Sequence, residues 1–327
     1  MQVTISKSAG LRNDLLLAIP REELETVRFH IINRDGFMGL PGLLRGTEKQ
    51  DAGERAAVGK LKRPVEEHLH AMAGVVDETG RPLRRLIAIG SRNVGNNRGF
   101  QAWQRGLTPQ RFLIRGDTPW DRPVPMLALT RGQGLEARDL RLSERTVFEE
   151  CRDITEEIEW CVFANCVLRR GRAIPVEEMA DQFYDMAHLA AADRGTERGK
   201  QIWEALYHGF DLRPRGEIVA ALRRLRVPRN RYLHNAVGLA PARVTLLQRE
   251  GTVEEMAQWL REAGAEDGFI LDNGGSVFCW AWWIGEKGGY LFRAPDFREP
   301  SSAVLAFLLR GAPYTDLPPG SVSYSAA

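Results

Sequence analysis

The stretch GFILDNGGSVFCWAWW, residues 268–283, restricts the possible folds of this chain more than any other segment. The apolar residues 269–271 end abruptly in Asp-Asn-Gly-Gly-Ser, and a second apolar run starts at Val277. Short apolar runs bounded by turn residues are typical of buried strands. The sequence therefore predicts two core strands joined by a polar corner, residues 272–276, which holds more functional groups than a turn needs.

The second run predicts a strand that is buried on both faces. Phe278, Trp280 and Trp282 alternate with small or apolar residues, and an aromatic stripe with a period of two is usually part of a core. Cys279 lies inside this strand and is predicted to be a buried small residue rather than a nucleophile. Only Trp283, near the end of the strand, is a candidate for stacking on a sugar.

Strand signals recur along the chain, and helix signals are fewer. Further strands are predicted around residues 27–31, 86–89, 124–129, 243–248 and 303–309. Thr252 and Glu255 form a capping box for a helix whose predicted buried stripe is Val253, Met256, Ala257 and Leu260, and Gly264 ends that helix. From these signals we predict an α+β fold in which a mixed β-sheet core is flanked by helices.

The order of these signals predicts one large α+β domain over residues 1–327. Residues 1–173 form a strand-rich N-terminal half, and residues 228–327 form a C-terminal half that carries the corner. Between them, residues 174–227 show apolar positions at i, i+3 and i+4 spacing, which predicts a helical insert of two or three helices.

Composition excludes several classes of protein. A net charge of +2 over 327 residues gives no overall field that attracts nucleic acid or an anionic membrane surface. Neither a secretory signal nor a membrane span is evident, so we expect a cytoplasmic protein. The four cysteines lack metal-ligand spacing. We predict no metal site and no cofactor, although a divalent metal ion bound to Asp272 remains an alternative.

The order of motifs in residues 229–309 resembles the phosphodiester glycosidase family, which includes bacterial proteins associated with exopolysaccharides. The resemblance rests on Arg231, on Ala-Val-Gly at 236–238, on Gly-Ala at 264–265 and on the corner, in that order. Asn273 stands where the family has the first glycine of the corner, and the helical stretch is not part of the family pattern. The resemblance implies a phosphodiester-glycosidase-like fold and a basic residue at Arg231 that binds phosphate or sugar.

The corner has its own chemical logic. Asp272, at a strand end, is suited to act as a base, a nucleophile or a metal ligand. Gly274 and Gly275 allow backbone N–H groups to converge on an anion, and the Ser276 hydroxyl adds a donor. Alternatively, Asp272 and Ser276 only satisfy backbone groups of the turn.

Further candidate residues lie near the corner or in a separate loop. His234 titrates in the range of a general acid, and Asn235 and Asn273 suit sugar hydroxyls, although a lone histidine is more often a structural hydrogen-bonding residue. Arg92 and Asn93 begin a loop rich in asparagine and arginine, which suits either a polyhydroxylated ligand or an exposed loop. No second carboxylate is assigned; the candidates are Asp35, Asp296 and Glu299.

We therefore predict a hydrolase, or a related transferase, that acts at the anomeric carbon of a sugar-phosphate or nucleotide-sugar phosphodiester. Asp272 and His234 are the predicted catalytic residues. The predicted substrate-binding residues are Arg92, Asn93, Arg231, Asn235, Asn273, Gly274, Gly275 and Ser276. The partner is a small-molecule sugar phosphate or a polysaccharide-derived substrate, with no nucleic acid and no membrane. The alternative is a carbohydrate- or nucleotide-binding protein on the same scaffold without catalytic activity.

Overall fold

A computed structural model describes residues 2–7, 13–31, 63–91, 102–104, 124–140, 157–179, 215–224, 229, 231–282, 288–295, 297, 303–311 and 322–326. The strands are β1 (Gln2–Lys7), β2 (Asn13–Pro20), β3 (Leu24–Ile31), β4 (Arg85–Ser91), β5 (Ala102–Gln104), β6 (Val124–Thr130), β7 (Gly134–Leu140), β8 (Ile158–Phe163), β9 (Asn165–Arg169), β10 (Arg172–Ala173), β11 (Tyr232–Leu239), β12 (Arg243–Gly251), β13 (Asp267–Asn273), β14 (Phe278–Ala281), β15 (Gly289–Arg293), β16 (Ala303–Leu309) and β17 (Val322–Ala326). The helices are α4 (Val65–Ala71), α7 (Val176–Met179), α10 (Arg215–Arg224), α11 (Val253–Glu262) and the 3₁₀ turn η7 (Gly274–Ser276).

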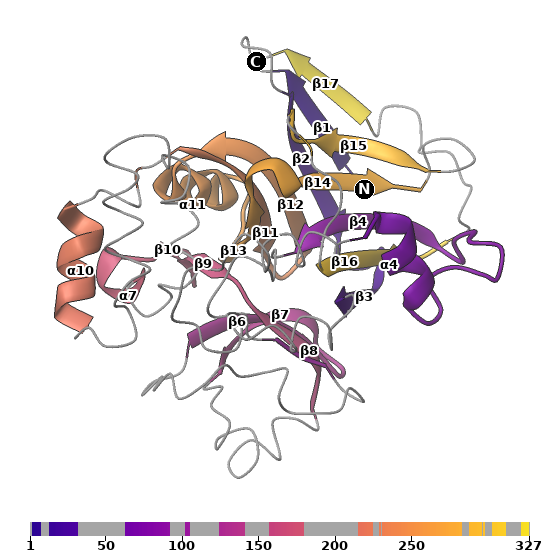
Figure 1. Cartoon of the computed structure of the whole chain (residues 1–327), viewed down its shortest axis with the longest axis horizontal. Helices are drawn as coiled ribbons and strands as arrows, with labels where there is room; N and C mark the ends of the chain where they lie inside the picture. Colours follow the sequence, from indigo (N-terminus) through magenta and orange to yellow (C-terminus); the bar gives the residue numbers. More distant parts are fainter. Residues whose placement is uncertain are drawn as a thin grey trace, which may run out of the picture.

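These strands form three sheets (Figure 1). Sheet A has eight strands in the order β10-β9-β13-β11-β12-β2-β1-β17, sheet B has five in the order β15-β14-β4-β16-β3, and sheet C has four in the order β5-β8-β6-β7. Among the described strands, β1 and β17 pair in parallel and all other neighbours pair antiparallel. The described part of the chain is therefore mostly antiparallel β-sheet.

This architecture shows that the predicted α+β class, a mixed sheet core flanked by helices, is wrong. The fold is β-rich: most of the described elements are strands, and the two larger sheets pack face to face around the main core. A continuous apolar run indicates that both faces of a strand are buried, but it does not show whether a helix or another sheet covers them. The stretches predicted to be helical do contain helices, α7 and α10 in residues 174–227 and α11 after Thr252, but the described chain holds far more strand than helix.

The largest core is centred between sheets A and B and extends to residues of sheet C and α11. It is built from alternate residues of the facing strands, and burial of each such side chain contributes roughly 1.5–3 kcal/mol. Its central members are Leu15, Leu17, Ile19, Val27, Phe29, Ile87, Ile89, Val237, Leu246, Leu305 and Phe307, and all are at most 2% exposed.

The far face of sheet B carries a second core. There, Val65 and Leu69 of α4 pack in one cluster with Phe278, Trp280 and Trp282. The opposite face of the same strand directs Val277 and Cys279 into the core between the sheets. The predicted burial of both faces of the aromatic strand is confirmed, and burial raises the pKa of the Cys279 thiol, as expected for an unreactive cysteine. Trp283 lies outside the described residues.

Helix α11 covers the other face of sheet A, and its sequence signals are confirmed. The Thr252 side chain accepts a hydrogen bond from the backbone N–H of Glu255, and the Glu255 carboxylate accepts one from the backbone N–H of Thr252. The predicted stripe Val253, Met256, Ala257 and Leu260 is buried. Gly264 follows with a φ of 82°, a conformation that favours glycine and ends the helix.

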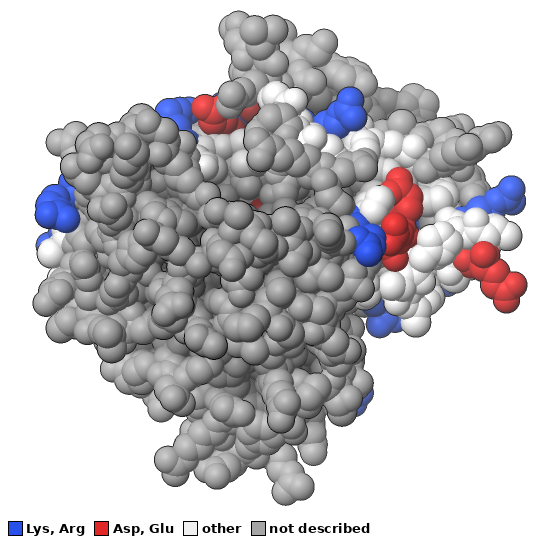
Figure 2. All heavy atoms as spheres, in the orientation of Figure 1, with Lys and Arg blue, Asp and Glu red and all other residues white. Residues whose placement is uncertain are grey.

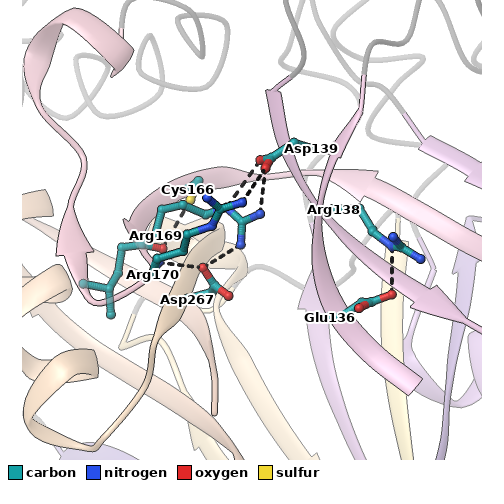
Figure 3. Close-up of polar contacts among 8 residues, drawn as sticks. Glu136, Arg138, Asp139, Cys166, Arg169, Arg170 and Asp267 are labelled. Carbon is teal, nitrogen blue, oxygen red and sulfur yellow. Dashed lines mark hydrogen bonds and ion pairs between the residues drawn. The ribbon is translucent and has the colours of Figure 1, made fainter. Parts of the chain in front are cut away.

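An arginine joins sheet C to sheet A (Figure 3). The Arg169 guanidinium donates from Nη2 to Asp139 of β7 at 2.8 Å and from Nη1 to Asp267 of β13 at 2.8 Å. Burial lowers the pKa of Arg169, but the two carboxylates more than offset this effect and raise it. A tight turn follows β9, with Arg170 and Gly171 both at positive φ.

The middle of the chain is described only in part. The predicted insert, residues 174–227, contains the described helices α7 and α10, and residues 180–214 lie outside the described residues. Strands from both predicted halves, among them β1, β2 and β9 from the first and β11 to β13 from the second, share sheet A. The two halves thus contribute to common layers.

Charged side chains of both signs lie near one another on the face shown in Figure 2, over the residues that the structure describes. Such interspersed charges are typical of a solvated surface. In the same described residues, each helix is too short or too polar to cross a bilayer.

Candidate functional site

The corner is the place where the chain passes from one sheet to another. β13 ends at Asn273 in sheet A, the 3₁₀ turn Gly274–Ser276 follows, and β14 begins at Phe278 in sheet B. Gly274 adopts a φ of 73°, which favours glycine, and Val277 N–H donates to the Gly274 carbonyl at 3.2 Å. The four residues 273–276 are half-buried, so this turn reaches solvent at the junction of two layers.

Asp272 lies at the inner edge of this junction. The residue is 7% exposed, its Oδ2 is buried, and its Oδ1 accepts a hydrogen bond from the backbone N–H of Asn273 at 2.8 Å. Its Oδ2 points toward Gly90 of β4, since a Cβ atom added at Gly90 would lie 3.3 Å from it. The same added atom would lie 3.1 Å from Phe278 and 3.3 Å from the Ser276 carbonyl oxygen, so Gly90 lets β4 approach the corner closely.

Two buried amides continue from Asp272 across sheet A. Asn235 of β11 pairs with Asp272 of β13 on one side and with Gln248 of β12 on the other. Asn235 Nδ2 donates to the Gly90 carbonyl at 2.6 Å, and its Oδ1 accepts from Gln248 Nε2 at 2.6 Å. Because Asn235 is 0% exposed and both ends of its amide bond protein groups, the structure does not present it to solvent as the predicted sugar-binding group.

His234 lies on the opposite face of sheet A. Successive side chains of a strand alternate, and the His234 ring nitrogen Nε2 lies 3.0 Å from the carbonyl of Gly251, directly before α11. Burial lowers the pKa of His234 to about 4, so the ring is neutral at pH 7. The structure therefore does not bring His234 together with Asp272.

Arg231 and Asn273 also belong to the side of the sheet toward α11. Arg231 Nη1 donates to both carboxylate oxygens of Glu255, at 2.9 and 2.8 Å, and its side chain is 55% exposed. Burial raises the pKa of Glu255, but hydrogen bonds from Thr252 and Arg231 more than offset this and hold it below its usual range. Asn273 pairs with His234 in the register of β11 and β13.

Ser276 and Asp272 both make contacts within the turn, as the alternative interpretation of the corner expects. The Ser276 hydroxyl donates to the Asn273 carbonyl at 3.3 Å. Gly274 lies beside Tyr232, whose ring would be 3.6 Å from a Cβ atom added at Gly274. The turn is thus held on one side by Tyr232 and on the other by the Asp272–Gly90 contact.

Several predicted residues lie outside the described part of the chain. They include the substrate-binding candidates Arg92 and Asn93, which follow Ser91, the last residue of β4. The three candidates for a second carboxylate, Asp35, Asp296 and Glu299, are also outside it. Their roles stay predictions.

Gln248 and Gly90 were not among the site residues predicted from the sequence. Gln248 could have been found, because the hairpin turn at residues 240–242 places it opposite Asn235, where an apolar residue is expected in a buried strand. No sequence signal places Gly90 beside Asp272, since the contact joins two different sheets. In the residues that the structure describes, no group of three or more His, Cys, Asp or Glu side chains could hold a metal ion.

Comparisons with solved structures give distant likenesses of fold, among them the following two. No family model and no curated protein matches the chain. The catalytic domain of zebrafish N-acetylglucosamine-1-phosphodiester alpha-N-acetylglucosaminidase, auto-inhibited by its pro-peptide, is similar with a TM-score of 0.49 and 12% identity, over 91% of this chain and 78% of that one. A hypothetical protein from Synechocystis is similar with a TM-score of 0.36 and 9% identity, over 94% of this chain and 61% of that one. At these values neither likeness assigns an activity to this chain.

Proposed function

We propose that the chain breaks the bond between the anomeric carbon and the phosphate oxygen of a sugar phosphodiester, with Asp272 as the catalytic carboxylate. The observation that carries this proposal is the position of Asp272 at the crossing between sheets A and B, directly before a half-buried glycine turn. The resemblance of residues 229–309 to the phosphodiester glycosidases supports the same choice of residues. Of the three adjacent polar residues Asp272, Asn235 and Gln248, Asp272 is 7% exposed and the other two are 0% exposed, so Asp272 is the one nearest to solvent, although its Oδ2 is buried.

The proposed chemistry needs one carboxylate and one anion site. Water, deprotonated by Asp272, attacks the anomeric carbon while the bond from that carbon to oxygen breaks and its electron pair leaves with the phosphate. The leaving group is a phosphomonoester, whose second pKa is about 6, so its departure does not require a strong general acid. For this reason the proposal needs no proton from His234. If an alcohol replaces water, the same step is a transfer.

The Gly274–Ser276 backbone is the proposed phosphate site. Positive φ at Gly274 turns the chain so that successive N–H groups can face one anion, and the half-buried turn is open to a ligand. Arg231 is bound by Glu255, and the proposal gives it no phosphate contact.

The alternative proposal is a carbohydrate- or nucleotide-binding protein without catalytic activity. The observation that favours it is the engagement of Asp272 and Ser276 within the turn itself. Both proposals place the ligand at the corner, but only the first requires the Asp272 carboxylate for bond cleavage.

The experiment that separates them compares wild type, Asp272→Asn and Asp77→Asn. Asp77 is a matched control, because its carboxylate accepts hydrogen bonds from backbone N–H groups of an exposed turn and it lies outside the corner. Alkyl phosphodiesters of α-sugar 1-phosphates and UDP-sugars are incubated with each protein, and free sugar and phosphomonoester are followed by ³¹P NMR. The proposal expects turnover by wild type and by Asp77→Asn but not by Asp272→Asn. Binding without turnover in wild type, retained in Asp272→Asn, would establish the alternative.

A further inference from the structure

The buried row formed by Gln248, Asn235 and Asp272 ends the apolar core between sheets A and B. Along β12 and β11, the residues that face sheet B are apolar, for example Leu246 and Val237, until this level of the sheet is reached. At this level the same face carries a glutamine, an asparagine and an aspartate on three adjacent strands. The change from apolar to polar is thus confined to one end of the core.

Burial of these polar side chains costs folding free energy unless their polar atoms form hydrogen bonds. Asn235 and Gln248 are both 0% exposed, and a buried amide is tolerated only when its polar atoms are bonded. Asn235 meets this condition with bonds at both ends, but Gln248 Oε1 has no hydrogen-bond partner among the described residues. A leucine and a methionine would fill these positions without that loss, so packing alone does not explain the two amides.

The hydrogen bonds of Asn235 indicate a structural role for the two amides, which is to connect sheet A to sheet B. Asn235 Nδ2 reaches out of sheet A and holds the carbonyl of Gly90 in sheet B, and Gln248 holds the other end of the Asn235 amide. Gly90 is also the residue against which Asp272 Oδ2 and the Ser276 carbonyl lie. One buried amide therefore fixes the piece of backbone that faces the carboxylate.

We propose that Asn235 and Gln248 are positioning residues, which set the Asp272 carboxylate at the corner by fixing Gly90 of sheet B against β11 of sheet A. This inference rests on the proposed function, because it concerns the group assigned there to catalysis. Asn235 acts through Gly90 and touches no substrate. Its role differs from the substrate contact predicted from the sequence.

The test uses Asn235→Leu and Gln248→Met, with Thr245→Val as the matched control. Thr245 is a buried polar residue of the same hairpin, 2% exposed, but it lies on the face toward α11, beside Gly238 and Leu260. On a phosphodiester that wild type hydrolyses, Asn235→Leu is expected to lower kcat on the order of 10²-fold with KM changed less than about 3-fold, because the carboxylate is misplaced while the turn remains. Gln248→Met keeps the bond to Gly90, so it is expected to lower kcat about 10-fold. Thr245→Val is expected to leave kcat and KM unchanged.

Amide hydrogen exchange provides a measurement that does not depend on activity. The Asn273 N–H donates to Asp272 Oδ1, so its exchange rate reports whether the carboxylate holds its position. We expect exchange at Asn273 to be about 10-fold faster in Asn235→Leu than in Thr245→Val under conditions of equal global stability. If Asn235→Leu does not fold, the exchange rate of the Asn273 amide in Gln248→Met is compared with that in Thr245→Val instead.

The outcomes separate the two proposals. Turnover by wild type with an unchanged kcat in Asn235→Leu and Gln248→Met overturns the positioning role and leaves the proposed function intact. If wild type hydrolyses no phosphodiester, the proposed function fails and exchange at Asn273 decides the positioning role alone. Equal exchange in the variants and in the control overturns it.

Discussion

The two faces of sheet A use their polar residues differently. Toward sheet B, Asn235 and Asp272 meet at Gly90, and the contacts converge on the corner. Toward α11, Arg249 lies with its guanidinium carbon 3.9 Å from the centre of the Trp259 ring and pairs with Asp14 at 3.1 Å. On that face the polar residues hold the helix, and on the other they surround a carboxylate.

The difference shows how much one step along a strand changes the role of a residue. His234 and Asn235 are adjacent in the sequence, and both were predicted from it to belong to one site. In the sheet, His234 contacts the carbonyl before α11 and Asn235 contacts β4. Alternation along β11 separates two residues that a motif keeps together.

Among substitutions on the two faces of sheet A, the largest expected effect is a loss of turnover. Asp272→Asn should lower kcat by about 10³-fold or more, because the reaction loses its only assigned carboxylate. His234→Gln should leave kcat within about 3-fold, because its side chain belongs to the other face and glutamine can still donate to Gly251. Steady-state kinetics on the same phosphodiester measure both. A loss of similar size in His234→Gln would place the histidine in the reaction and contradict the separation of the faces.

The next effect is the pH dependence of stability, which belongs to the α11 face. Burial lowers the pKa of His234 to about 4, against about 6.5 in an unfolded chain. Between these values the unfolded chain binds a proton that the folded chain does not, so stability is complete above pH 6.5 and falls as the pH falls toward 4. His234→Gln should remove roughly 3 kcal/mol of this acid-induced loss, measured by urea unfolding at pH 7 and at pH 4. Parallel losses in wild type and variant would show that His234 is not buried in its neutral form.

A smaller effect is expected at the contact between β4 and the corner. A methyl group at Gly90 would press on Phe278, Asp272 Oδ2 and the Ser276 carbonyl, so Gly90→Ala should lower the free energy of unfolding by about 1 kcal/mol. Gly216→Ala is the control, since an added Cβ there meets nothing within 4 Å. Thermal unfolding of both variants decides, and equal stability in the two would mean that the space between β4 and the corner is larger than described.

The smallest effect is expected at Arg231. Its ion pair with Glu255 is exposed, and exposed pairs contribute less than about 1 kcal/mol and weaken with salt. Arg231→Ala should therefore lower stability slightly at low salt and hardly at all at high salt, with KM unchanged. A KM increase of about tenfold would instead support the phosphate contact that the family resemblance implies for this residue.

Local elements could be predicted from the sequence because each depends on neighbouring residues. The capping box at Thr252, the end of the helix at Gly264 and the strand at residues 303–309 all follow from local patterns, and the structure confirms them. The fold class could not be predicted in this way, because the residues that cover an apolar strand lie elsewhere in the chain. For the same reason the sequence singled out Asp272 but not Gly90.

The direct crossing from β13 to β14 has a mechanical consequence. Only the four residues 274–277 connect these two strands, so this connection has no slack segment to absorb a sliding movement of one sheet over the other. A ligand bound to this turn would contact the junction of sheets A and B and would stabilise their relative position. The unfolding temperature and the mechanical unfolding force of the paired sheets should then rise as the turn becomes occupied. The increase should be larger for a ligand of higher affinity.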